Sequence, residues 1–229
     1  MFGKKNKNKT FKILAVSDNE VLEEFSIEQL KSMFRDIDFI MSAGDVSNHY
    51  LDFLVTALNK DLIYVNGNHV YGTNHDISFC KNIDGKVIDY KGLKIFGLDG
   101  SQKYSRGPHQ YSEQEMNSKI MKNIFYLGFG HLDIVLSHSP PRHIHDKDDF
   151  THRGFEVFHK IIKNFKPKLW LHGHVHLNNH HENVETTVEN TRIVNVYGYK
   201  IIEYQKSRWY FMIGKYLDLE AEEAYDKFK

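Results

Sequence analysis

The chain has 229 residues, of which 41% are hydrophobic and 26% charged, a composition ordinary for a globular protein with one sizeable core. Thirty basic and thirty acidic side chains cancel, so the chain lacks the overall positive field that holds nucleic acid, and we expect no nucleic-acid partner. The single cysteine, Cys80, excludes an intrachain disulfide. No apolar run approaches the ~18 residues that a membrane span needs, so we expect a cytoplasmic protein without a membrane partner.

The first part of the chain alternates between short apolar runs and helical patterns. Buried strands are predicted at residues 11–17, 39–43 and 62–65. Between them, Ser26 and Gln29 form a capping box that opens one helix, and the apolar spacing over residues 51–58 predicts a second. This alternation indicates an α/β fold in which neighbouring strands are parallel.

The later part mixes further strands and helices. Strands are predicted at residues 86–90 and 93–98, which form a hairpin, at 134–136 and 169–171, and within the β-rich stretches 191–204 and 208–213. Helices are predicted from Ser112 to about Tyr126, along the apolar stripe of residues 155–165, and over residues 217–228. Residues 1–10 are basic and Asn-rich, so we expect a disordered tail followed by one domain at 11–229.

Five of the predicted strands end in loops that carry metal-ligand residue types. These residues are Asp18 and Glu20, Asp45, Asn68 and His69, His138, and His174 and His176. Ligands of open α/β sheets bind beyond the carboxyl ends of strands, so loops distant in sequence can meet there. Carboxylates, imidazoles and an amide oxygen suit Mn, Fe or Zn, and a shared carboxylate would hold two ions about 3.5–4 Å apart.

Each of these residues also has an ordinary structural interpretation. An aspartate after a strand is often a helix cap or a turn residue, Asn68 fits a turn, and paired histidines are often on the surface. The metal interpretation depends on the ensemble, because five separate strand ends all carry ligand types.

In order, the motifs are Asp18-x-Glu20, Gly44-Asp45, Gly67-Asn68-His69, His138 and Gly173-His174-Val175-His176. This series closely resembles the calcineurin-like metallophosphoesterases, whose pattern is D-x-H, G-D, G-N-H-(D/E), H and G-H-x-H, and it spans about residues 11–176. The resemblance implies a four-layer α-β-β-α sandwich of two packed mixed sheets with two metal ions at the sheet edge.

The resemblance also implies a role for each residue. One ion would be held by Asp18, Glu20, Asp45 and His176. The other would be held by Asp45, Asn68, His138 and His174, with Asp45 as the bridge. His69 would be the catalytic residue that contacts the phosphate and helps the leaving oxygen depart.

Two positions depart from the family pattern. Glu20 stands where the family usually has histidine, as in a bacterial branch of the family, and its harder carboxylate favours Mn or Fe over Zn. Val70 stands where an acidic residue usually follows, so His69 lacks one orienting partner.

We expect hydrolysis of a small phosphate monoester or diester by a hydroxide activated at a dinuclear metal centre. The alternative is a weakly active or inactive scaffold of the same fold, which Glu20 and Val70 favour. The candidate substrate-binding residues are Arg142, His145, Asp146, His152 and Arg106, although each also fits a solvated polar loop. The substrate, the native metal and the oligomeric state stay open.

Overall fold

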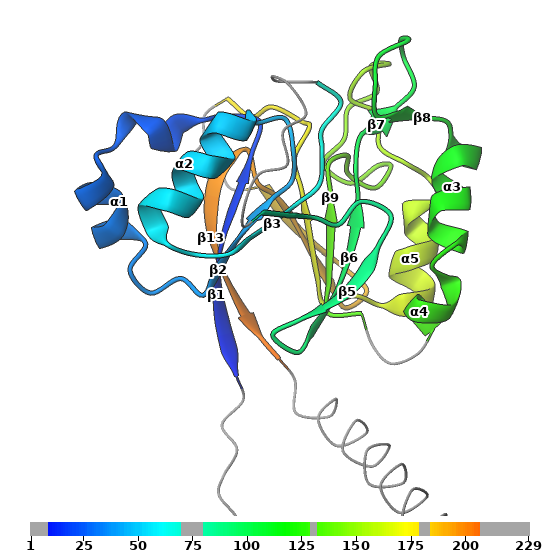
Figure 1. Cartoon of the computed structure of the whole chain (residues 1–229). Coiled ribbons are helices and arrows are strands. Elements are labelled where there is room, and N and C mark those ends of the chain that lie inside the picture. Colours follow the sequence, from blue (N-terminus) through cyan, green and yellow to red (C-terminus); the bar gives the residue numbers. More distant parts are fainter. Residues whose placement is uncertain (1–8, 70–79, 129–131, 179–183, 207–229) are drawn as a thin grey trace, which may run out of the picture.

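The computed structural model describes residues 9–69, 80–128, 132–178 and 184–206. These residues form four layers: helices α1 and α2, a first sheet, a second sheet, and helices α3, α4 and α5 (Figure 1). The helices are α1 (Ile27–Met33), α2 (Asn48–Leu58), α3 (Glu113–Met121), α4 (Ile124–Gly128), α5 (Phe158–Phe165) and the short 3-10 helix η1 (Val21–Glu24). The four-layer sandwich of two mixed sheets is therefore confirmed.

The first sheet has the order β13-β1-β2-β3-β4 within the described residues. Its strands are β1 (Thr10–Ser17), β2 (Phe39–Ser42), β3 (Leu62–Tyr64), β4 (Cys80–Asn82) and β13 (Gly198–Gln205). Strands β1 to β4 run parallel to one another, and β13 pairs antiparallel with β1. The carboxyl ends of β1, β2 and β3 therefore lie at one edge.

The second sheet has the order β11-β12-β10-β9-β6-β5 among the described residues. Its strands are β5 (Val87–Tyr90), β6 (Leu93–Leu98), β9 (Ile134–Ser137), β10 (Leu169–His172), β11 (Val184–Val188) and β12 (Thr191–Asn195). Strands β6, β9, β10 and β12 are parallel, and β5 and β11 are antiparallel edge strands. Two short strands, β7 (Ser101–Gln102) and β8 (Gln110–Tyr111), pair separately above this sheet (Figure 1).

Strand alternation explains how the layers hold together. Along β1, Ile13 and Ala15 are buried between the two sheets, whereas Leu14 and Val16 pack under α1 and α2. Successive side chains of a strand point to opposite faces, so a strand buried on both faces reads as a continuous apolar run. Trp170 of β10 packs instead against the helices of the outer layer.

Most predicted elements are confirmed, including both capping boxes, at Ser26 with Gln29 and at Ser112 with Glu115. The helix expected to reach Tyr126 was wrong in extent: α3 ends at Met121 and α4 follows. The buried Asn123 side chain donates to the Gly85 and Lys119 carbonyls at this break.

Other differences concern elements without an apolar signal. Four strands were not predicted: β4, β7, β8 and β11, the last of which carries mostly exposed side chains. Strand β1 begins at Thr10, which pairs with Gln205, so the last residue of the expected tail is ordered. The rest of that tail up to residue 8, the strand expected at 208–213 and the helix expected at 217–228 lie outside the described residues.

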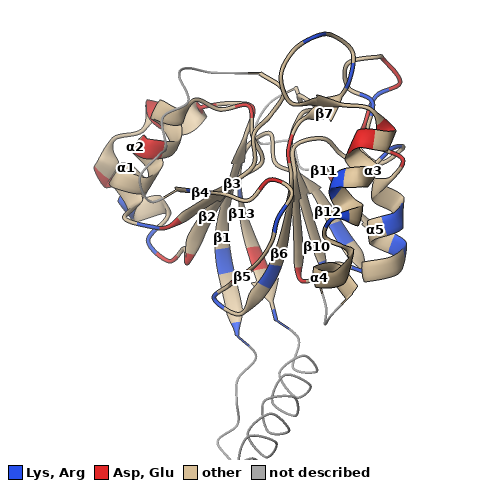
Figure 2. Ribbon diagram, turned by 45° about the vertical axis from the view of Figure 1, so that its right-hand side comes forward, with Lys and Arg blue, Asp and Glu red and all other residues tan. Residues whose placement is uncertain are grey.

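No helix among the described residues is long and apolar enough to cross a membrane. Lys and Arg residues, blue in Figure 2, are scattered along the chain, and a group of them lies at the lower ends of β1, β5 and β6. That end is opposite to the loops that follow the parallel strands.

Candidate metal centre

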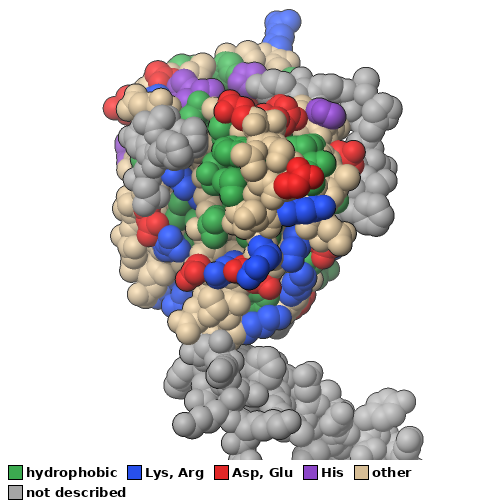
Figure 3. Space-filling model, turned by 90° about the vertical axis from the view of Figure 1, so that its left-hand side faces the viewer, with side chains coloured by type: hydrophobic (Ala, Val, Ile, Leu, Met, Phe, Trp, Pro, Cys, Tyr) green, Lys and Arg blue, Asp and Glu red, His purple; other side chains and the backbone are tan. Residues whose placement is uncertain are grey.

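The loops after β1, β2, β3, β9 and β10 meet at the edge between the two sheets. Backbone hydrogen bonds join them: Asp18 N donates to Gly44 O (3.2 Å) and Gly173 N donates to His138 O (3.0 Å). Figure 3 shows histidine side chains along the upper edge of the face that it presents. The convergence expected from parallel topology is therefore present.

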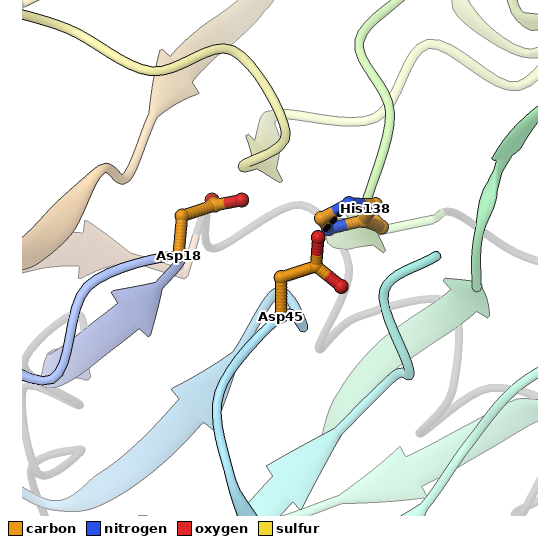
Figure 4. Close-up of side chains that lie close together, drawn as sticks. All are labelled: Asp18, Asp45 and His138. Atoms are coloured by element: carbon orange, nitrogen blue, oxygen red, sulfur yellow. Dashed lines mark ion pairs between the residues drawn. The ribbon is translucent and has the colours of Figure 1, made fainter. Parts of the chain in front are cut away.

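Asp18, Asp45 and His138 form the group best placed to hold a metal ion within the described residues. One ligand atom of each lies within 4.8 Å of the others. Figure 4 shows the three side chains extending from different loops toward a common space. Asp45 Oδ2 lies 3.3 Å from His138 Nε2.

Hydrogen bonds fix the tautomer of His138. The ring is fully buried, its Nδ1 donates to the Ala43 carbonyl (2.8 Å), and Nε2 faces Asn68 Oδ1 (3.0 Å) and Asp45. Burial lowers the pKa of His138, but the charges of Asp45 and Asp18 and the hydrogen bonds of the ring outweigh it and raise the pKa to about 9. The surrounding oxygens therefore stabilise a proton on Nε2. A divalent cation could replace this proton and bind the same oxygens.

The Asp18 carboxylate provides the clearest test of whether a cation fits. Its Oδ2 accepts hydrogen bonds from Ser17 Oγ (2.5 Å) and His174 N (2.9 Å), while buried Oδ1 has no hydrogen-bond donor among the described residues. Burial raises the pKa of Asp18 against the opposing effect of His138. A buried carboxylate oxygen without a donor is costly, and a cation would satisfy it. The residues present therefore fit a metal.

The two histidines after β10 lie on either side of this group. His174 Nε2 donates to the Thr151 carbonyl (2.7 Å), and its ring centroid is 4.9 Å from that of His138. Burial and the charge of His138 lower the pKa of His174 to about 3, which leaves the ring neutral with its lone pair on Nδ1. His176 Nε2 lies 3.8 Å from Asp18 Oδ1, and its ring packs against Tyr197.

His69 is oriented by Asp45. The His69 backbone N–H donates to Asp45 Oδ1 (2.9 Å), and ring Nδ1 donates to Oδ2 (2.6 Å). The side chain is 56% exposed, so the ring lies at the surface of the centre. His138 and His69 together lower the pKa of Asp45 although burial alone would raise it. Val70 lies outside the described residues.

Glu20 has a different position from the other expected ligands. Its Oε1 accepts a hydrogen bond from the backbone N–H of Ser47, the residue that caps α2. Glu20 thereby joins the loop after β1 to the start of α2, and it is not part of the group of Asp18, Asp45 and His138.

Two glycines of the motifs are required by close packing around the carboxylates. A Cβ on Gly67 would overlap the Asp45 carboxylate, and a Cβ on Gly173 would overlap Ser17 Oγ and Asp18 Oδ2. Any side chain there would move a backbone segment away from the site.

Three expected substrate-binding residues contact other protein groups. Arg142 donates to Asp146 Oδ2 (2.6 Å) and Asp148 Oδ1 (2.8 Å), and Asp146 also accepts from Gly154 N (3.0 Å). His145 Nδ1 lies 2.9 Å from His172 Nε2, and its Nε2 lies 2.8 Å from Thr186 Oγ1. These contacts hold the loop together, and substrate binding by these residues stays a prediction.

The other two candidates lie nearer the surface. The ring centroid of His152 is 5.5 Å from that of His174, and its Nδ1 donates to Asp149 Oδ1 (2.9 Å). His152 therefore borders the centre. Arg106 is exposed in the loop between β7 and β8, and its role also stays a prediction.

Two tyrosines beside the centre were missed in the sequence. Tyr104 accepts a hydrogen bond from Asn68 Nδ2 (2.9 Å), and Tyr197 packs against His176 with ring centroids 5.2 Å apart. Tyr104 lies in a long loop without periodicity and Tyr197 in a short link after β12, so no spacing signal marks either residue.

A family model described as calcineurin-like phosphoesterase matches residues 11–178. The chain belongs to this family. The resemblance seen in the motifs is thereby confirmed, and the family uses divalent metals. A search of the curated proteins finds no match to this chain.

Two solved structures share the fold. One crystal structure aligns with a TM-score of 0.61 at 17% identity and covers 87% of this chain and 100% of its own. The protein TT1561 of Thermus thermophilus aligns with a TM-score of 0.58 at 13% identity, covering 86% of this chain and 99% of its own. A more distant match, described as a novel archaeal phosphodiesterase, aligns with a TM-score of 0.42 at 14% identity and covers 84% of this chain and 99% of its own.

Proposed function

We propose that this calcineurin-like phosphoesterase hydrolyses a small phosphate monoester or diester with the help of two divalent metal ions. The observation that supports this most is the group of Asp18, Asp45 and His138, in which the buried Asp18 Oδ1 has no hydrogen-bond donor among the described residues. Family membership supports a metal-dependent phosphoesterase in general.

The ligands divide into two sets that share Asp45. Asp18, Glu20, Asp45 and His176 would hold one ion, and Asp45, Asn68, His138 and His174 would hold the other. The proximity of His176 to Asp18 and of His174 to His138 supports this division. Glu20 uses Oε1 for Ser47, so Oε2 is the oxygen it would offer to an ion. Its hard carboxylate favours Mn or Fe over Zn.

When bound, the ions would supply a hydroxide nucleophile near neutral pH and offset charge on the phosphate oxygens. The residues of the chain provide orientation and a proton. Asp45 holds the His69 ring by its Nδ1, which leaves Nε2 at the exposed side of the centre to contact the phosphoester and protonate the leaving oxygen. The hydrogen bond to Ala43 keeps His138 Nδ1 protonated and leaves Nε2 for an ion.

The test is hydrolysis of nitrophenyl phosphate and bis(nitrophenyl) phosphate by the full chain. We expect turnover with added Mn²⁺, loss of turnover with a chelator, and recovery when Mn²⁺ is restored. Turnover that survives complete metal removal would overturn the proposal, and the ratio of the two rates assigns monoesterase or diesterase preference.

One observation favours the alternative of a scaffold without turnover. Glu20 contacts the N-cap residue of α2, so it acts as a structural link where the family usually has a histidine. A scaffold would bind metal normally yet fail to hydrolyse either ester with Mn²⁺ or Fe²⁺ present.

A further inference from the structure

Tyr104 contacts a predicted metal ligand from outside the motifs. Its hydroxyl accepts a hydrogen bond from Asn68 Nδ2 (2.9 Å), while Asn68 Oδ1 lies 3.0 Å from His138 Nε2. Asn68 is 4% exposed, so each hydrogen of its amide group needs a partner within the protein. Tyr104 accepts from one hydrogen of the amide nitrogen, whose other neighbour is His69 Nδ1 at 3.4 Å, and the amide oxygen faces the centre.

The loop that carries Tyr104 is tied at its tip by Gln110. The Gln110 Oε1 atom accepts from the backbone N–H of Tyr104 (3.2 Å) and of Ser105 (2.8 Å). Gln110 itself belongs to β8, which pairs with β7 at the start of the same loop. The backbone at Tyr104 is therefore fixed relative to the two short strands (Figure 1).

A buried ion cluster fastens the base of this loop to the body of the fold. Asp99 is 1% exposed, its Oδ2 lies 2.6 Å from His109 Nδ1, and its Oδ1 lies 2.6 Å from Lys119 Nζ of α3. Lys119 also contacts Asp84 at 3.0 Å. Buried charges that pair in this way are costly to separate, so the loop has a defined position.

We propose that Tyr104 is a positioning residue of the metal centre. Gln110 holds its backbone, and the ion cluster of Asp99, His109, Lys119 and Asp84 holds the base of its loop. The Tyr104 hydroxyl thereby fixes the Asn68 amide with Oδ1 toward the ion that Asn68 and His138 would share. This inference rests on the proposed function, because Asn68 is a ligand only if the centre binds metal.

The physical consequence is preorganisation. In Tyr104→Phe the ring is kept, but Asn68 Nδ2 loses its 2.9 Å hydrogen bond and keeps only the 3.4 Å contact with His69 Nδ1, so the buried amide can rotate away from the centre. Residues that orient a ligand typically contribute about 10–100-fold to metal affinity. One of the two Mn²⁺ ions should therefore bind ~10–100-fold more weakly, and the other should bind as in the wild type.

The experiment is calorimetric titration of the full, metal-free chain with Mn²⁺. The matched control is Tyr90→Phe, which removes a tyrosine hydroxyl at the opposite end of the strands. There the Tyr90 hydroxyl donates to the Asp61 carboxylate (2.5 Å). This control should keep both affinities. Gln110→Ala should weaken the same ion as Tyr104→Phe by a smaller factor.

A double variant separates positioning from a general structural effect. If Tyr104 acts through Asn68, adding Tyr104→Phe to Asn68→Ala should cause no further loss of Mn²⁺ affinity. Additive losses, or a wild-type affinity in Tyr104→Phe, would overturn the inference and leave the metal centre standing. Wild-type protein that binds no Mn²⁺ would overturn the proposed function and the inference together.

Discussion

Asp45→Asn is the substitution with the largest expected effect, because Asp45 contacts both histidines that flank it. The carboxylate accepts from His69 N (2.9 Å) and His69 Nδ1 (2.6 Å) and lies 3.3 Å from His138 Nε2. An asparagine can keep the first contact with its oxygen, but its NH₂ group then faces the two ring nitrogens.

The metal-free protein can tolerate this change. His138 sheds the proton that the carboxylate charge stabilised, which removes the repulsion between donors. What is lost is one or two hydrogen bonds to a charged group, each worth about 1.5–3 kcal/mol. We therefore expect a folded variant.

The affinity for metal ions should fall much more than the stability does. At ~4 Å and an effective dielectric constant of about 20, a unit charge attracts another unit charge by ~4 kcal/mol and a divalent cation by about twice that, so we expect a loss on the order of 10³-fold or more in affinity. Because Asp45 belongs to both proposed ligand sets, both ions should be affected and turnover nearly abolished.

The assay combines circular dichroism, Mn²⁺ titration and nitrophenyl phosphate turnover. Asp61→Asn, at the opposite end of the strands, is the matched control and should behave as the wild type. Normal turnover in Asp45→Asn, or weakened binding of a single ion, would refute the bridging role.

His69→Ala should keep both metals and lower kcat by about 10²–10⁴-fold with little change in KM. The loss of kcat should be smaller for nitrophenyl phosphates than for alkyl phosphates. Equal losses across leaving groups would mean that His69 only binds phosphate. Gly173→Ala should lower the free energy of unfolding by about 1–3 kcal/mol and weaken Mn²⁺ binding, because the new methyl group overlaps Ser17 and Asp18. A methyl group at Gly128 meets nothing within 4 Å, so Gly128→Ala should behave as the wild type in the same unfolding and titration experiments. The contact with Asp99 raises the pKa of His109 above 6.5, so its stabilising contribution is complete below pH 6.5 and is lost as the pH rises through the raised value. The stability difference between wild type and His109→Gln in urea unfolding should therefore shrink on going from pH 6 to higher pH, and a difference independent of pH would contradict this.

Much of the fold is predictable because local patterns agree with the tertiary structure. The apolar run of β1 and the capping box at Ser26 each follow from residues adjacent in sequence. The end of α3 does not, because it depends on an Asn123 side chain that reaches Gly85 in a distant turn. The strand β11 carries exposed side chains and therefore has no apolar signal.

The candidate site shows the same division. The loops that carry Asp18, Asp45 and His138 are predictable because parallel strands end at one edge. The partners of charged loop residues are not, since Arg142 reads equally well as a phosphate contact or as the internal partner of Asp146 that the structure shows. Tyr104 is identified only from its distance to Asn68, a contact across 36 positions of the chain.

The most direct test of a dinuclear centre is anomalous diffraction from crystals of the full chain grown with Mn²⁺. The account predicts two peaks about 3.5–4 Å apart, with Asp45 between them and Asp18 and His138 on opposite sides. A single peak, or peaks that do not contact Asp45, would contradict it.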